Sequence, residues 1–142
     1  ASYMQYWKDD YNSGNIILAA RYVSSNAIHQ MSKLDFGKWD EYLEWLYDYE
    51  YGKLGLPVAD KTIFLDMPIE ISQKFLLKRY NGDNAKKDIH ESHMDYLQRC
   101  RKSALYAADK LSWSVIECSK DGIPMTIEQI SSMIINEISE VI

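Results

Sequence analysis

The stretch NIILAARYVSSNAIHQ, residues 15–30, decides the fold that the sequence predicts. Its first six residues, 15–20, are an apolar run without alternation, which is typical of a strand covered on both faces. Residues 21–26 are polar and predict a loop, and Asn26 is a suitable N-cap for a helix over 27–34. The stretch therefore predicts a strand, a loop and a helix in this order.

Two further apolar runs, 61–66 and 113–118, also predict strands. Helices are expected over 3–13, 38–54, 68–80 and 91–111. A last helix opens at Thr126, which forms a capping box with Gln129. Strands separated by helices indicate parallel pairing. The predicted fold class is therefore α/β: a single domain over 1–142, with three parallel strands and helices on both faces.

One acidic residue interrupts the apolar face of the aromatic-rich helix predicted over 38–54. The residues that fall near this face are Trp39, Leu43, Leu46, Glu50 and Leu54. We interpret the aromatic residues as core packing in preference to a stacking surface, because such side chains are usually buried.

Length and composition exclude several classes of protein. The 142 residues fit one domain, and the formal net charge of −5 does not indicate nucleic-acid binding. Two cysteines are too few for a disulfide scaffold and indicate reduced thiols. No apolar run approaches the roughly 20 residues of a membrane span, and residues 1–10 do not predict a signal peptide. We therefore expect a cytoplasmic protein that binds neither nucleic acid nor membranes.

The richest candidate site follows the first predicted strand. Ligands of open α/β sheets bind beyond the carboxyl ends of the strands, where Arg21 precedes Ser25 and Asn26. An arginine beside hydroxyl and amide groups suits a phosphate, and Gln30 offers a paired donor and acceptor for an amide or nucleobase edge. A structural salt bridge at Arg21, with Ser25 and Asn26 as helix caps, explains the same residues equally well.

Other polar clusters give weaker signals. The cationic residues of the segment 78–87 could close over a polyanion, although a solvated charge run is the preferred interpretation from the residues alone. His90 and His93 lie three apart beside Glu91, but no third ligand follows at a recognised spacing, so no metal site is predicted. The sequence contains neither GxxxxGK[ST] nor GxGxxG.

The opening stretch resembles the strand–loop–helix of thymidylate kinases, a family of P-loop nucleoside monophosphate kinases whose motif is DRYxxSxxxxQ. The matching positions are Ala20, Arg21, Tyr22, Ser25 and Gln30. Downstream, KTIFLDMPIE (61–70) resembles the family's next strand, and KRYNGDNAKKDIHE (78–91) resembles its lid and the helix after it. WSVIECSKDGIPMTIEQI (113–130) resembles the last strand, the adenine-side loop and the final helix. The resemblance thus covers essentially the whole chain in the family's order.

The resemblance implies phosphoryl transfer from ATP, with Mg²⁺, to dTMP, giving dTDP in pyrimidine deoxynucleotide synthesis. On the acceptor side it implies that Arg21 lies by the phosphate of dTMP and that Gln30 binds the thymine edge. It also implies that Tyr22, Ser25 and Asn26 lie beside the acceptor nucleotide. A homodimer is also implied, with 38–54 as a candidate contact surface.

The resemblance extends to the ATP side and the deoxyribose. It implies that Arg79, Lys86 and Lys87 contact the ATP phosphates and that Lys120 lies near the adenine. His90 and Glu91 match residues near the deoxyribose.

The sequence departs from the family in three places. The family begins with a strand and a glycine-rich phosphate loop, which have no counterpart here, so we expect an N-terminally incomplete part of such a domain. Ala20 replaces an acid of the magnesium site, and Ile89 stands where many members have a lid arginine. The methyl group of Ala20 cannot hold a hydrated cation. Because the phosphate loop and its lysine supply the cradle and the charge for the transferred phosphoryl group, we expect no useful kinase activity from this chain alone. The alternatives are a non-catalytic nucleotide-binding module, a truncated fragment, or a kinase of another deoxynucleoside monophosphate.

Overall fold

The computed structural model describes residues 2–79, 87–139 and 141, and among these the side chains outside 76–93. The helical elements are η1 (Tyr3–Trp7), α1 (Lys8–Asn12), α2 (Ser24–His29), η2 (Met31–Lys33), η3 (Phe36–Lys38), α3 (Trp39–Tyr47), η4 (Asp48–Lys53), α4 (Ile69–Arg79), α5 (Lys87–Lys110) and α6 (Ile127–Ile138). The strands are β1 (Ile63–Asp66), β2 (Ser114–Glu117), β3 (Ser119–Lys120) and β4 (Ile123–Pro124).

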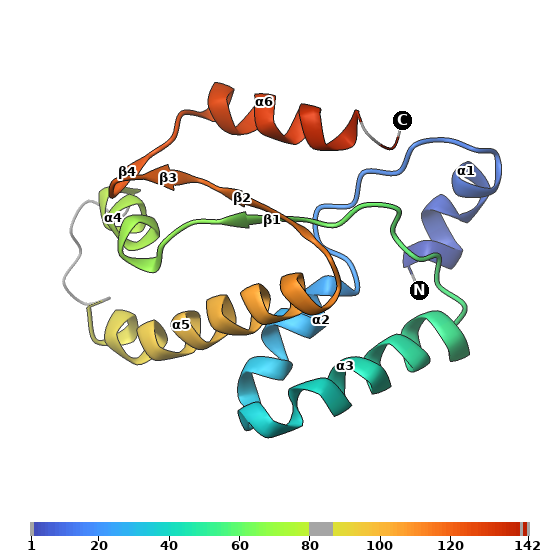
Figure 1. Cartoon of the computed structure of the whole chain (residues 1–142), viewed down its shortest axis with the longest axis horizontal. Helices are drawn as coiled ribbons and strands as arrows, with labels where there is room; N and C mark the ends of the chain where they lie inside the picture. Colours follow the sequence, from blue (N-terminus) through green and yellow to red (C-terminus); the bar gives the residue numbers. More distant parts are fainter. Residues whose placement is uncertain (1, 80–86, 140, 142) are drawn as a thin grey trace.

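A small parallel sheet lies at the centre of the molecule, between α6 on one side and α5 on the other (Figure 1). Its strands β1 and β2 pair in parallel, with Ile63 opposite Ser114 and Asp66 opposite Glu117. Because parallel strands need a long crossover, the chain passes through α4 and α5 between them. The structure therefore confirms a mixed helix-and-strand fold with parallel pairing.

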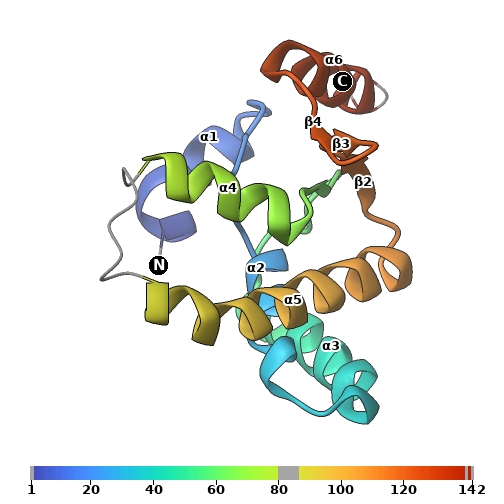
Figure 2. The ribbon, with the colours of Figure 1, turned by 90° about the vertical axis from the view of Figure 1, so that its left-hand side faces the viewer.

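The main hydrophobic core lies where α5 packs against α2 and α3, on the side of α5 away from α4 (Figure 2). Small residues on α5, among them Ala104 and Ala107, have no exposed surface and let α2 approach closely. Ser103 reinforces this contact, because its Oγ donates a hydrogen bond to the backbone carbonyl of Ile28 at 2.7 Å. Trp39, Leu43 and Leu46 of the predicted core stripe are buried from α3, whereas Leu54 at the end of the stripe is 53% exposed.

The strand predicted over 15–20 is wrong. These residues form an irregular segment between α1 and α2 (Figure 1), and the parallel sheet has two strands instead of three. Ile16 is 71% exposed and Leu18 is 88% exposed. An apolar run forms a covered strand only beside a neighbouring strand, and no described strand pairs with this one.

The helix predicted over 27–34 begins earlier than expected, at Ser24, and continues after His29 as η2. The N-cap predicted at Asn26 is therefore wrong. Arg21 has a positive φ of 85°, which turns the chain early, and the backbone N–H of Asn26 already donates to Val23. The Asn26 side chain is thereby free to contact another element.

The remaining helices follow the sequence closely. The helix predicted over 38–54 is present as α3, which continues into the π-helical turn η4. Thr126 and Gln129 form the predicted capping box of α6, with hydrogen bonds of 2.9 and 3.2 Å. Residues 119–124 form the hairpin of β3 and β4, whose two central residues, Asp121 and Gly122, both have positive φ. Within the described chain, no helix is both long and apolar enough to span a bilayer.

Candidate functional site

Arg21 and Ser25 are brought together at the start of α2. The Nε of Arg21 donates a hydrogen bond to Ser25 Oγ at 3.2 Å, and the Arg21 side chain is exposed. The φ of 85° at Arg21 lies in the left-handed region, which non-glycine residues rarely adopt and which is frequent at functional sites. A guanidinium held by one of its five N–H groups keeps the others for an anion in solvent.

Asn26 is held by a residue that the sequence did not assign to the site. Its Nδ2 donates to Glu50 Oε1 at 3.2 Å, and both side chains are half-buried. This bond leaves the Asn26 Oδ1 as an acceptor beside Ser25. Glu50 lies on η4, and its signal in the sequence was that it alone interrupts an apolar stripe.

Tyr22 is half-buried, and its hydroxyl is bound to the backbone. Its hydroxyl donates to the backbone carbonyl of Pro57 at 2.9 Å, and its ring packs edge-on against Trp7 with centroids 5.9 Å apart. Burial, with the negative charge of Glu50, raises the pKa of Tyr22. The phenol therefore stays protonated at neutral pH and serves as a structural donor.

His29 connects α2 to α5. Its Nδ1 lies 3.2 Å from Tyr96 Oη and 3.5 Å from Cys100 Sγ, whose thiol also donates to Ser32 Oγ at 3.4 Å. Burial lowers the pKa of His29, and the positive charges of Arg21 and Lys33 lower it further. A neutral imidazole can accept the Tyr96 proton at Nδ1, so this pair holds α5 beside the Arg21 loop. The sequence did not assign Tyr96 to the site.

The structure does not bring the other predicted site residues into contact with Arg21 and Ser25 among the described side chains. Gln30 follows α2 and is exposed, and its Oε1 accepts from Lys33 Nζ at 2.9 Å. Lys120 is exposed on β3, in the hairpin after β2. Lys86 lies outside the described residues, and the side chains of Arg79, Lys87, His90 and Glu91 lie outside the described side chains. The predicted ATP-phosphate and deoxyribose contacts therefore stay predictions.

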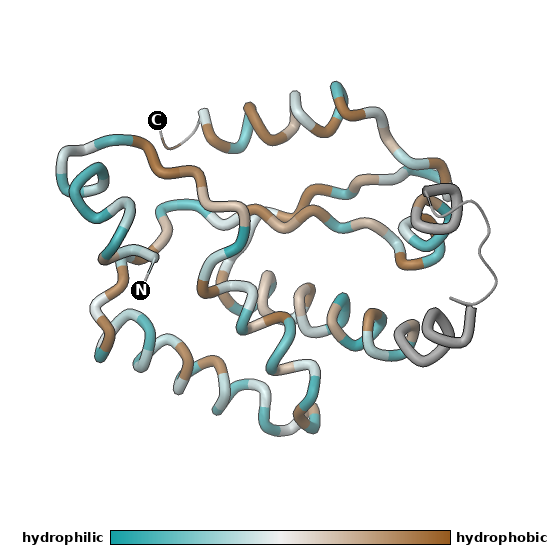
Figure 3. Tube along the Cα trace, turned by 180° about the vertical axis from the view of Figure 1, so that it is seen from behind, coloured by the Kyte–Doolittle hydropathy of each residue, from teal (hydrophilic) through white to brown (hydrophobic). Residues whose placement is uncertain are grey.

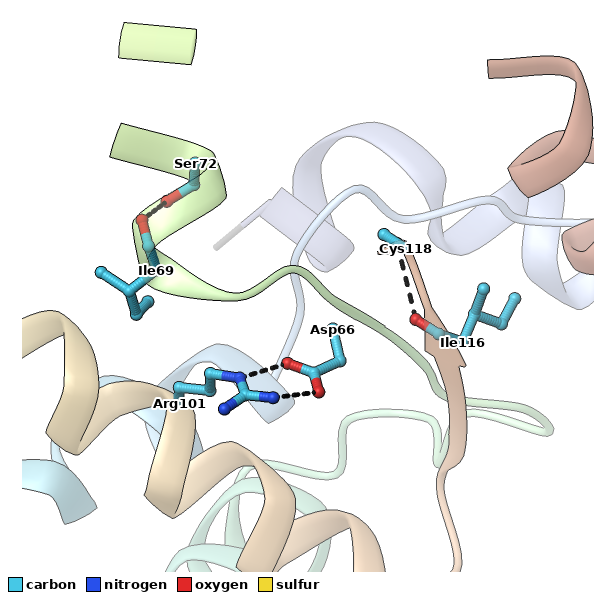
Figure 4. A network of polar contacts seen from close by, with 6 residues as sticks. All are labelled: Asp66, Ile69, Ser72, Arg101, Ile116 and Cys118. Atoms are coloured by element: carbon cyan, nitrogen blue, oxygen red, sulfur yellow. Dashed lines mark hydrogen bonds and ion pairs between the residues drawn. The ribbon is translucent and has the colours of Figure 1, made fainter. Parts of the chain in front are cut away.

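A half-buried ion pair occupies the carboxyl end of β1. Arg101 on α5 donates to both oxygens of Asp66, from Nε at 2.6 Å and from a second guanidinium nitrogen at 2.7 Å (Figure 4). Asp66 is only 7% exposed, and its carboxylate raises the pKa of Arg101. A cavity of about 320 Å³ adjoins Arg101 between α4 and α5.

The described residues do not fit the Mg²⁺ that the resemblance implies. Ala20 offers no side-chain oxygen, and both oxygens of Asp66 are engaged by Arg101. In the part of the chain that the structure describes, no three His, Cys, Asp or Glu side chains converge to hold a metal ion.

The chain was compared with protein families, curated proteins and solved structures. No protein-family model, no curated protein and no solved structure matches the chain. The fold and the site define a mixed helix-and-strand chain with a small parallel sheet and an exposed arginine held at the start of a helix.

Proposed function

We propose that this chain binds a pyrimidine deoxynucleoside monophosphate, dTMP in the first place, as the acceptor-binding part of a thymidylate kinase-like protein. The observation that carries the proposal is the hydrogen bond of 3.2 Å from Arg21 to Ser25. These are the two polar positions of the motif RYxxS, and the fold brings them together at one turn.

The phosphate of dTMP is dianionic near neutral pH, and Arg21 supplies the matching charge. Its exposed guanidinium can give two parallel N–H bonds to phosphate oxygens, the arrangement in which arginine binds phosphate best. The Ser25 hydroxyl, 3.2 Å from Nε, is placed to donate to a third oxygen. The same hydroxyl accepts from Arg21 through a lone pair, which fixes the direction of the guanidinium and leaves the hydroxyl proton for the ligand.

Two side-chain amides would bind the nucleoside: that of Asn26, which lies on α2, and that of Gln30, which follows α2. Glu50 fixes Asn26 through its Nδ2, so that Oδ1 can accept from a ligand hydroxyl or imide N–H. Gln30 offers both a donor and an acceptor for the thymine edge once it leaves Lys33, and that contact is exposed and costs little to break.

The experiment is a calorimetric titration with dTMP, with dUMP and AMP as controls, on protein of verified mass. We expect saturable binding of dTMP in preference to AMP, and we expect Arg21→Ala to weaken it at least about tenfold, because a charged hydrogen bond contributes roughly 1.5–3 kcal/mol. Lys38→Ala, which removes an equally exposed cation on η3, is the matched control and should bind normally. Equal affinity of Arg21→Ala and wild type would refute the proposal.

Ala20 favours a second candidate function, a non-catalytic nucleotide-binding module. Incubation of the chain with ATP, Mg²⁺ and dTMP separates the two. Binding of dTMP without formation of dTDP supports the module, whereas turnover at a rate comparable with thymidylate kinases would exclude it.

A further inference from the structure

Charged side chains and apolar walls converge at the cavity between α4 and α5. The cavity has a volume of about 320 Å³ and is lined by Ile69 and Glu70 from α4 and by Gln98, Arg101, Lys102 and Leu105 from α5. None of these six lining residues is among those assigned to the nucleotide. The volume lies at the lower end of the range for small-molecule sites, so the cavity suits a ligand much smaller than a nucleotide.

The guanidinium of Arg101 is held in place at one wall of this cavity. Asp66 takes two of its five N–H groups, through bonds of 2.6 and 2.7 Å, and leaves three. The Arg101 side chain is 37% exposed and that of Asp66 is 9% exposed, so the pair is covered on its Asp66 side and open on its Arg101 side. A guanidinium that is already fixed loses little side-chain entropy when it binds a second anion. Arg101 is therefore a preorganised donor for a carboxylate.

A carboxylate on the other wall acts on Arg101 across the cavity. Glu70 lies in the first turn of α4 and is exposed. The hydrogen bonds of Asp66 raise the pKa of Arg101 most, and the negative charges of Asp66 and Glu70 raise it further. Among the described side chains, no ion pair joins Glu70 to Arg101 directly. A ligand that carries one charge of each sign can satisfy both walls.

The apolar lining residues determine what the ligand carries besides its charges. Apolar and polar residues follow one another along the described part of α5 (Figure 3), and Leu105 lies one turn after Arg101. Ile69 lines the other wall from the start of α4 (Figure 4). Both apolar side chains are half-buried, so an apolar group between them would remove more of their surface from water. Lys102 contributes its aliphatic stem, because its Nζ lies over the ring of Phe36 at 5.6 Å.

We propose that the cavity between α4 and α5 binds a free α-amino acid with an apolar side chain, in its zwitterionic form. The carboxylate of the ligand accepts from Arg101, its ammonium donates to Glu70, and its side chain packs between Ile69 and Leu105. Gln98, one turn before Arg101, adds an amide donor for the same carboxylate. A carboxylic acid without an ammonium would leave Glu70 without a partner, and an amine without a carboxylate would leave Arg101 without one.

The test is an NMR titration of the full chain, labelled with ¹⁵N, with L-leucine. We expect saturable changes in the backbone signals of residues 69–72 and 98–105, which surround the cavity. Two analogues share the carbon skeleton of leucine: 3-methylbutylamine lacks the carboxylate and 4-methylpentanoate lacks the ammonium. Loss of the carboxylate should weaken binding at least about tenfold, because it removes charged hydrogen bonds. Loss of the ammonium should weaken it about three- to fivefold, because Glu70 is exposed.

Two variants separate the ammonium contact from the shape of the cavity. Glu70→Gln should weaken L-leucine about three- to fivefold without weakening 4-methylpentanoate, so the preference between the two ligands is lost. Glu44→Gln, which changes an exposed glutamate on α3, is the matched control and should bind L-leucine normally. Gln98→Trp should weaken all three ligands at least about tenfold, because a large side chain at this exposed position fills the cavity.

Four results would each overturn the proposal. They are an absence of saturable changes with L-leucine, changes confined to other parts of the chain, equal affinity for L-leucine and both analogues, and unchanged binding of L-leucine in Glu70→Gln. Displacement of L-leucine by dTMP would also overturn it, because the amino acid would then occupy the site at Arg21.

Discussion

Asp66 and Arg101 show how one side-chain pair can hold a whole element in place. The pair joins the end of β1 to the middle of α5, which also carries Tyr96. We expect Asp66→Asn to lower the free energy of unfolding by about 1–3 kcal/mol, because it leaves a charged donor without its carboxylate. Arg101→Lys should also destabilise, since an ammonium cannot make both bonds.

Urea denaturation measures both changes. Asp48→Asn is the control, because its ion pair with Lys53 is exposed on both sides, and we expect no measurable effect there. If Asp66→Asn were no more destabilising than Asp48→Asn, the Asp66–Arg101 pair would not be what fixes α5.

His29 should make the stability of the fold depend on pH. Its pKa in the folded chain is lowered by burial and by Arg21 and Lys33, whereas its value in the unfolded chain is about 6.5. Below pH 6.5 the unfolded chain therefore binds a proton that the folded chain does not. The stabilisation is present above pH 6.5 and is lost as pH falls through the folded pKa.

His29→Gln tests this dependence, because its amide can still accept from Tyr96 but does not titrate. Between about pH 7.5 and 5.5, the wild type should lose more stability to urea than this variant. His90 and His93 are present in both proteins, so their titration cancels in the difference. Parallel pH profiles would show that His29 titrates alike in the folded and unfolded chains.

At the scale of the element, the contact of α5 with α2 depends on small side chains. Ala104 has no exposed surface, and we expect Ala104→Leu to destabilise the fold by about 1–3 kcal/mol, because the added methyl groups would force the helices apart. Urea denaturation again provides the measurement. Arg99→Leu, at an exposed position of the same helix, should have a much smaller effect, and equal effects would contradict close packing at Ala104.

Elements whose signals are local were predicted well. The capping box of Thr126 and Gln129 is complete within four residues, and β1 lies inside the predicted run 61–66. Residues 15–20 carry the same kind of signal but form no strand, because strand pairing depends on a neighbouring strand that the local pattern of apolar residues does not reveal. The N-cap predicted at Asn26 fails for a related reason, since the positive φ of Arg21 starts the helix early.

The candidate site shows the same limit at the scale of the whole molecule. Arg21 and Ser25 are four residues apart, so a sequence motif could pair them. Glu50 lies 24 residues from Asn26, and Tyr96 lies 67 residues from His29, so only the fold brings these groups together. The contact of Arg21 with Ser25 was therefore predictable from the sequence. The contacts that η4 and α5 make with α2 were not.

The distribution of burial also predicts that stability is uneven across the molecule. Residues 104–108 lie largely in the core between α5 and α2, whereas residues 15–19 are largely exposed and pair with no described strand. Hydrogen exchange of the chain, measured by mass spectrometry, should therefore be faster at 15–19 than at 104–108, because backbone N–H groups of the exposed segment are accessible without unfolding of the core. Protection of 15–19 as strong as that of 104–108 would contradict this difference and would mean that the segment is covered.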